Sequence, residues 1–155
     1  MTTEENKALV QRLIEAQNRQ DWQAAAACYA ADASNHGRRV GREGIARVYR
    51  SLYAAFPDFR FELELLLADG EWVVAHYTMT GTHAGAPDLP VLGGLLNDVR
   101  PTGTRVAVQN IHCYRIEDGV IAEHRAVRDD LGMMQQLGLL PTTSHSAGDI
   151  SRPAR

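Results

Sequence analysis

The sequence lacks several features that would assign it to a class of protein at once. It has only two cysteines, Cys28 and Cys113, far apart and without a Cys-x-x-Cys pair, so we expect neither a structural zinc site nor a disulfide framework. The longest apolar run is eight residues, 24–31, whereas a membrane helix needs about 20. Residues 2–7 contain neither a basic nor an apolar segment, so no secretory signal is expected. These absences favour a reduced, cytoplasmic protein that does not bind membranes.

An excess of positive charge is also absent. The chain has 16 basic and 19 acidic residues and a net charge of −3, so nucleic acid is not an expected partner. No Gly-rich phosphate loop, Gly-x-Ser-x-Gly turn or His-Glu-x-x-His helix occurs. The six histidines have no spacing typical of metal ligands, and we expect no metal site.

Length and composition indicate one globular domain. The chain has 155 residues, 45% of them hydrophobic and 23% charged, which is enough to bury a core but too short for two full domains. We place the domain at residues 1–141. Residues 142–155 consist mainly of Ser, Thr, Gly, Pro and charged side chains, and are expected to be a disordered tail.

The first third of the chain has helical patterns. Thr2 and Glu5 have the spacing of a capping box, which satisfies free backbone N–H groups at a helix start. The next apolar residues have helical spacing: Leu9, Val10, Leu13 and Ile14. Asp21 is a candidate cap for a second helix. A third helix is expected from Gly41 until Pro57 ends it.

After Pro57 the hydrophobic period changes from helical to alternating. The odd-numbered residues from Phe59 to Leu67 are apolar and alternate with polar residues at positions 60, 62 and 64, as in a half-buried strand. Further strands are predicted at residues 71–83, 105–116 and 120–128, and a short helix at 131–137. Helices followed by a sheet rich in hairpins indicate an α+β fold.

One long connection, residues 84–103, separates two of these strands. It contains three prolines and two adjacent glycines, but also six apolar residues between Leu89 and Val99. Connections of this length in a compact domain are usually lids, binding loops or disordered segments, and this one is too apolar for a solvated linker. We expect it to lie over a cavity or against another subunit.

Asp129 is the first candidate for a catalytic side chain. It follows the last predicted strand, where it would share a face with Glu123 and Arg125. A carboxylate that faces an apolar cavity has a raised pKa, which suits a general acid or base. Because Asp is also a preferred helix N-cap, a cap is the more common role for this position, and both roles are compatible if Asp130 is the cap and Asp129 turns inward.

Other polar side chains lie within apolar strands. His112 shares a strand face with Asn110 and Tyr114, so these groups could line a polar cavity, although a histidine in a strand is more often a hydrogen-bonded core residue. Arg125 needs a carboxylate partner if it is buried, or else it faces solvent. The remaining candidates for substrate contact are His36, Tyr49, His76 and His83.

Residues 118–138 resemble the C-terminal signature of SnoaL-like polyketide cyclases. The shared features are a turn glycine, Ile121-x-Glu123, Asp129, and an ending of Leu131-Gly132 followed by Gln-Leu-Gly. Residues 81–85 and His36 are also similar, and the resemblance spans about residues 5 to 140. The family tryptophan position is occupied here by Arg125.

The resemblance implies a cone-shaped, curved mixed sheet, closed by three N-terminal helices around a pocket, as in the nuclear-transport-factor-2-like superfamily. It implies acid/base catalysed, aldol-type ring closure of a hydrophobic polyketide-like intermediate, without cofactor or metal. Asp129 would be the acid/base and His112 an associated pocket residue. A homodimer or homotetramer is also implied. Arg125 in place of tryptophan favours an anionic or strongly polar substrate group.

Two other functions remain open at this point. Arginine and carboxylate pairs open epoxides in the wider superfamily, so Asp129 and Arg125 could form an epoxide-opening cyclase or hydrolase. The same fold could also serve as a non-catalytic protein that binds small molecules, because a fold by itself does not specify function.

Overall fold

The computed structural model describes residues 1–142 and shows an α+β fold with one curved, open sheet. The predicted tail therefore lies almost entirely outside the described residues. The helices are α1 (Thr3–Asn18), α2 (Trp22–Ala27), α3 (Gly41–Ala55) and α4 (Asp130–Gln136), with a short 3₁₀ turn η1 (Leu92–Gly94). The strands are β1 (Tyr29–Asn35), β2 (Arg38–Arg39), β3 (Arg60–Asp69), β4 (Trp72–Thr82), β5 (Arg105–Glu117) and β6 (Val120–Arg128).

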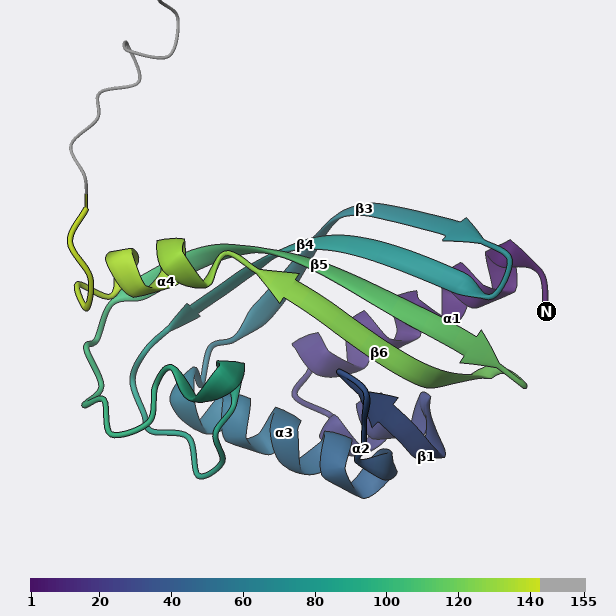
Figure 1. Cartoon of the computed structure of the whole chain (residues 1–155), viewed down its shortest axis with the longest axis horizontal. Helices are drawn as coiled ribbons and strands as arrows, with labels where there is room; N and C mark the ends of the chain where they lie inside the picture. The colour runs from purple at the N-terminus through teal and green to yellow at the C-terminus, as the bar shows by residue number, and fades with distance from the viewer. Residues whose placement is uncertain (143–155) are drawn as a thin grey trace, which may run out of the picture.

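The sheet is mixed, in the order β2-β1-β6-β5-β4-β3. Neighbours pair antiparallel except β1 and β6, which pair parallel. Helices α1, α2 and α3 lie along one face of the sheet, and α4 lies at one end of it (Figure 1). The core fills the space between these helices and the inner face, as the expected cone-shaped fold requires.

Local signals in the sequence account for the helix starts. Thr2 Oγ1 accepts a hydrogen bond from the Glu5 N–H at 3.2 Å, and the Thr2 N–H donates to Glu5 Oε2 at 2.7 Å, so the predicted capping box is confirmed. The side chain of Asp21 accepts from the Ala24 N–H at 3.0 Å and caps α2. The apolar residues of α1 at helical spacing are buried against the sheet.

Strand β3 departs from the predicted alternation. Its pairing with β4 shifts between Leu63 and Leu65, where one extra residue bulges out. The bulge reverses which side chains face inward, because side chains alternate along a strand. Leu65 and Leu67, expected in the core, are therefore 49% and 56% exposed on the outer face.

The long connection at residues 84–103 forms a strap over the inner face of the sheet. Its ends meet at His83, whose backbone N–H donates to Thr104 O and whose carbonyl accepts from the Gly103 N–H, both at 2.9 Å. Val91 and Leu96 of the strap are buried. The strap covers a cavity, which is one of the two expected placements.

Candidate functional site

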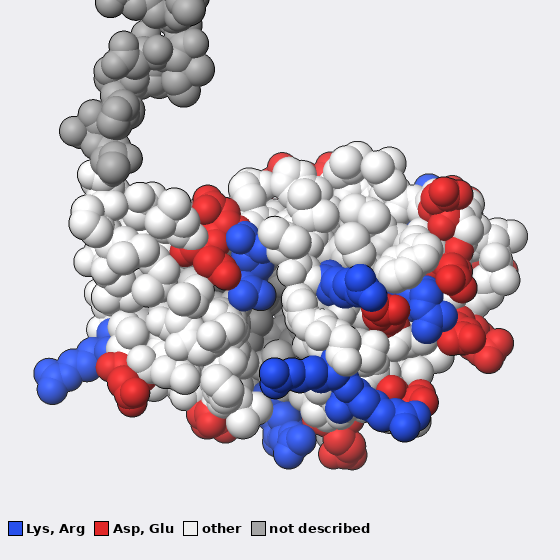
Figure 2. All heavy atoms as spheres, in the orientation of Figure 1, with Lys and Arg blue, Asp and Glu red and all other residues white. Residues whose placement is uncertain are grey.

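The main cavity lies between the inner face of the sheet, helix α3 and the strap, and has a volume of about 890 Å³. Figure 2 shows a hollow near the middle of the corresponding face of the molecule. A volume of this size is in the range of small-molecule sites. Apolar walls come from α3 and the strap, whereas the polar groups come mainly from β1, β5 and β6.

Two histidines from neighbouring strands meet in this cavity. His112 on β5 and His124 on β6 point inward, and His124 Nε2 lies 3.0 Å from His112 Nδ1. The Tyr114 hydroxyl lies 3.1 Å from the same His112 nitrogen. The Tyr114 and His124 rings stack at 4.8 Å, which fixes the orientation of the second imidazole. We call His112 and His124 the histidine pair.

The pair is uncharged at neutral pH. Burial, together with nearby His36 and Arg128, lowers the pKa of His124 to about 3. Burial also lowers the pKa of His112 well below its usual value, helped by His124 and Arg128. Desolvation disfavours the imidazolium form, and the Arg128 guanidinium adds repulsion.

Several buried polar atoms of the cavity have no hydrogen-bond partner among the described residues. Eight such side-chain atoms occur in residues 1–142, and five belong to residues that line the cavity: Gln17 Oε1, Asn35 Oδ1, Asn110 Oδ1, His112 Nε2 and His124 Nδ1. Buried polar groups are normally satisfied, because an unmade hydrogen bond costs about 1–3 kcal/mol. Five of these atoms lie at one cavity, where they are available to bond a polar ligand or water.

Four sequence-predicted residues are brought together here. His112 and Asn110 line the cavity from β5, and the Asn110 amide donates to Val108 O at 2.8 Å. His36 lines it from the β1–β2 turn, and Tyr49 lines it from α3, where its hydroxyl lies 2.9 Å from that of Tyr29. Burial, then Arg128 and Arg125, lower the pKa of His36.

The prediction that Asp129 faces the cavity is wrong. On β6 the inward side chains are His124, Ala126 and Arg128, so Asp129 belongs to the outward set. It is exposed and caps α4, because its Oδ1 accepts from the Gly132 N–H at 2.8 Å. The expected alternation is broken by a bulge: one extra residue, Ala122, lies between Ile121 and Glu123, so Ile121 points inward and is buried, whereas the later residues of the predicted face point outward.

The predicted placement of Arg125 in the cavity is wrong for the same reason. Its side chain is 64% exposed on the outer face, and its Nε donates to Glu123 Oε1 at 2.6 Å. The β6 guanidinium that lines the cavity is that of Arg128, whose Nε lies 3.0 Å from Asp130 Oδ1. The pair of Arg125 and Asp129 is therefore not formed, and the arginine–carboxylate pair at the cavity is Arg128 with Asp130.

His76 and His83 do not line the cavity. His76 is on the outer face of β4, hydrogen-bonded to Gln109 and 3.8 Å from Glu64 Oε2. His83 is fully buried beside the base of the strap, with Nδ1 3.2 Å from Thr102 Oγ1. Both were expected to contact substrate, but His76 lies on the outer face and His83 is buried beside the strap.

Sequence reasoning missed His124, Arg128 and Asp130. One signal was available, because His124 alternates with Val120, Ala122 and Ala126, and a histidine among small apolar residues suggests an inward face. The pairing of His124 with His112 depends on the β5–β6 register, in which Tyr114 is opposite His124.

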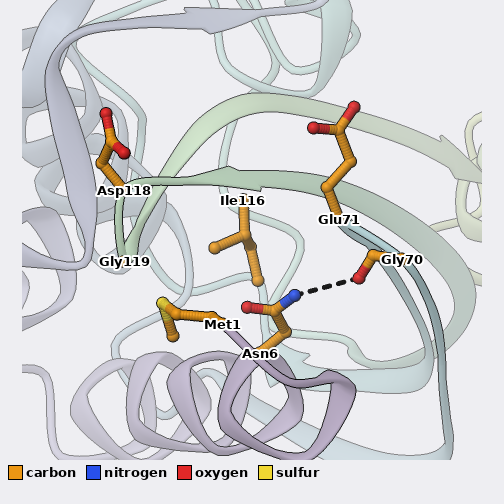
Figure 3. A pocket seen from close by; sticks show the side chains of 7 residues that line it. All are labelled: Met1, Asn6, Gly70, Glu71, Ile116, Asp118 and Gly119. Carbon is orange, nitrogen blue, oxygen red and sulfur yellow. Dashed lines mark hydrogen bonds between the residues drawn. The ribbon is translucent and has the colours of Figure 1, made fainter.

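A second, smaller cavity of about 400 Å³ lies where the β3–β4 and β5–β6 turns meet the start of α1. Figure 3 shows Asn6 beside Gly70, and the Asn6 amide donates to the Gly70 carbonyl at 3.0 Å. Its charged lining residues are Glu71 and Asp118. It has no histidine or arginine lining among the described residues, so the larger cavity is the stronger candidate.

No group of three or more His, Cys, Asp or Glu side chains within residues 1–142 is arranged to hold a metal ion. Among the same residues, no helix is long and apolar enough to cross a membrane.

Comparisons with known proteins agree with this fold. The model of the SnoaL-like polyketide cyclase family matches residues 7–137, and the chain belongs to this family. The nogalonic acid methyl ester cyclase of Streptomyces nogalater is 31% identical over 104 residues, which cover 66% of this chain and 71% of that relative. The aklanonic acid methyl ester cyclase of Streptomyces peucetius is 37% identical over 70 residues, which cover 45% of this chain and 42% of that relative.

Solved structures of other proteins have the same fold. TsrD from Streptomyces laurentii superimposes with a TM-score of 0.77 at 27% identity, over 90% of this chain and 99% of that chain. AclR from Streptomyces galilaeus superimposes with a TM-score of 0.75, also at 27% identity, over 90% of this chain and all of that chain. The expected family and the expected fold are both confirmed.

Proposed function

We propose that the protein is a polyketide cyclase that closes a ring by an intramolecular aldol-type reaction in the main cavity. Membership of the family and the cyclase activity of its named relatives support the reaction class. The observation that carries the proposed mechanism is the histidine pair, which has one outer nitrogen unpartnered on each ring. In this mechanism the histidine pair, and not the Asp129 carboxylate, acts as the acid/base.

The hydrogen bond within the pair determines the state of the outer nitrogens. Two neutral imidazoles carry two hydrogens on four nitrogens, and the bond between His124 Nε2 and His112 Nδ1 uses one of them. The second hydrogen is therefore on either His112 Nε2 or His124 Nδ1, and the other outer nitrogen has a lone pair. The pair always offers one proton donor and one proton acceptor to a ligand, without any ionic group.

These two groups match the needs of an aldol ring closure. The nitrogen with the lone pair removes a proton from a carbon between two carbonyls, and the resulting enolate carbon bonds to a carbonyl carbon of the same molecule. The other outer nitrogen gives its proton to the new alkoxide, while the bridging hydrogen moves from one ring to the other. The product is an isomer of the substrate, and no cofactor takes part.

The remaining unpartnered oxygens suit a hydroxylated polyketide. Gln17, Asn35 and Asn110 each present a carbonyl-type oxygen that can accept from a substrate hydroxyl. Binding the two reacting ends together contributes up to roughly 7–11 kcal/mol in ideal intramolecular cases. The apolar strap and α3 would exclude water from the enolate.

The test is incubation with nogalonic acid methyl ester, the compound in the name of one relative, followed by liquid chromatography and mass spectrometry. We expect a product of unchanged mass and altered retention, formed by the wild-type protein and not by His112→Gln. Binding of the ester without any product, at enzyme concentrations equal to substrate, would support a non-catalytic binding protein instead.

One observation favours a second candidate function, epoxide opening. Arg128 and Asp130 form an ion pair that lines the cavity, with Nε and Oδ1 3.0 Å apart. In this reaction Asp130 would activate water or protonate the epoxide oxygen, and Arg128 would stabilise the charge. An epoxide-bearing analogue of the ester distinguishes the two, because only an epoxide-opening enzyme would form a diol or cyclic ether from it.

We also propose that the protein is a homodimer and works in the cytoplasm. The outer face of the sheet exposes large apolar side chains of β3, β5 and β6, namely Leu65, Leu67, Ile111 and Val127. Such a patch on a sheet favours burial against a second copy. Both cysteines are free, which suits a reducing compartment.

A further inference from the structure

The charged groups of the main cavity gather at its mouth. Three lining residues carry a formal charge at neutral pH: Arg38, Arg128 and Asp130. The histidines are neutral, because burial and the Arg128 charge lower their pKa. Two cations face one anion, so the cavity carries a net positive charge. Figure 2 shows blue guanidinium groups around the hollow.

Arg128 is held in a fixed orientation. Its Nε donates to Asp130 Oδ1 at 3.0 Å and its Nη2 donates to Asp130 Oδ2 at 3.3 Å. The side chain is only 18% exposed, and it packs beside Gly93 of the strap. The other terminal nitrogen, Nη1, has no hydrogen-bond partner among the described residues. A guanidinium fixed by one carboxylate can bind another anionic oxygen at little cost in side-chain entropy.

Arg38 is directed to the cavity by the register of a short hairpin. In the β1–β2 pair, Asn35 is opposite Arg38, and both residues line the cavity. The turn between them is anchored, since the His36 N–H donates to the His124 carbonyl at 2.9 Å. Arg38 has no ion pair or side-chain hydrogen bond with any described residue. Its charge is therefore available to a ligand.

The next residue, Arg39, has a different position and its own partner. Arg39 is opposite Ser34, does not line the cavity, and forms an ion pair with Asp32. Two neighbouring arginines of the same hairpin thus face opposite sides. Arg39 provides a matched control for any effect of overall charge.

From this arrangement we propose that the mouth of the cavity binds an acidic oxygen group of the ligand, a carboxylate or an ionised enol or phenol, through Arg38 and Arg128. The inference rests on the proposed function in that it describes the substrate of the same cavity. A preference for an acidic group would distinguish this chain from the named relatives, whose names specify methyl esters. The acidic end would lie at the mouth and the hydroxylated end at the unpartnered oxygens further in.

The test compares two probes, anthraquinone-2-carboxylate and its methyl ester, in binding titrations with the full chain. The wild-type protein is expected to bind the carboxylate about tenfold more tightly than the ester at low salt, and Arg38→Gln to remove most of that difference. Arg39→Gln is expected to leave it unchanged. Because 0.3 M salt screens charges, it should weaken binding of the carboxylate alone.

Equal affinity for the two probes in the wild-type protein, or an equal loss in Arg38→Gln and Arg39→Gln, would overturn the proposal. Arg38 is exposed, so its substitution does not threaten folding. The titration measures binding and not turnover. A preference for the carboxylate can therefore be established even if the aldol reaction is not, and a failure of one is distinguishable from a failure of the other.

Discussion

His124 Nε2 lies 3.0 Å from His112 Nδ1, and the two rings come from adjacent strands that both face the main cavity. The bond leaves His112 Nε2 and His124 Nδ1 as the nitrogens available to a ligand, and neither has a partner among the described residues. Because the pair shares one hydrogen, proton uptake at one outer nitrogen is coupled to proton release at the other. This relationship gives the uncharged histidine pair both a base and an acid.

The first prediction concerns the protonation state of the pair. In ¹⁵N spectra of histidine-labelled protein at pH 7, His112 and His124 should each show one protonated and one bare nitrogen, because burial lowers the pKa of both. Assignment comes from His112→Gln and His124→Gln samples. An imidazolium signal from either ring at pH 7 would contradict the neutral pair.

The second prediction is a loss of stability in mild acid. Both histidines have a folded pKa below the ordinary value of 6.5, about 3 for His124, so below pH 6.5 the unfolded chain binds more protons than the folded one. The free energy of unfolding should fall by up to about 1.4 kcal/mol per pH unit for each histidine. Urea unfolding between pH 7 and pH 5 measures it.

The matched control for this slope is the double variant His112→Gln with His124→Gln. It removes both buried imidazoles, so its unfolding free energy should change less between pH 7 and pH 5. The pH range lies above the ordinary pKa of carboxylates, which therefore contribute little. An identical slope in wild type and double variant would show that the pair does not account for the effect.

The third prediction separates Asp129 from catalysis. Asp129→Ala removes the hydrogen bond to the Gly132 N–H and should lower the free energy of unfolding by about 1 kcal/mol. Asp129→Asn keeps a capping oxygen and should be close to wild type in stability. Turnover should be unchanged in both variants. A large loss of turnover in Asp129→Asn, with normal stability, would restore Asp129 as the acid/base.

The fourth prediction tests the outer face of the sheet. Leu65→Lys places a charge in the exposed apolar patch and should convert a dimer into a monomer of 17.1 kDa in light scattering coupled to size-exclusion chromatography. Leu131→Lys changes a leucine on α4 that is 61% exposed, against 49% for Leu65, and that is not one of the four patch residues; it should leave the mass unchanged. A monomeric wild-type protein would refute the dimer.

Much of the fold could be predicted from local patterns. The predicted strand at residues 120–128 matches β6, and the predicted strand at 105–116 differs from β5 by one residue at its end. The helix caps at Thr2 and Asp21 were also readable, because capping depends on residues three positions apart. Strands β1 and β2 were missed, since β1 follows an alanine-rich helix and pairs with β6, far away in sequence.

The residues that line the cavity were harder to predict from the sequence than the helices and strands. Strict alternation divides β6 into two faces, but the bulge at Ala122 exchanges these faces part-way along the strand, so Ile121 and His124 both point inward. Asp129 and Arg125 were predicted to line the cavity but lie on the outer face. The β6 side chains that do line the cavity include His124 and Arg128. On β5, His112 and Asn110 were found because their face is otherwise consistently buried. The bulge in β3 likewise has no local signature.

The most direct test of the central claim is the turnover of His112→Gln and His124→Gln with a methyl ester that the wild-type protein cyclises. Each variant should be slower by about 100- to 10,000-fold, the usual contribution of general acid–base catalysis, and His76→Gln, on the outer face, should match the wild type. Circular dichroism confirms that all three are folded. Wild-type turnover in both His112→Gln and His124→Gln would contradict the account.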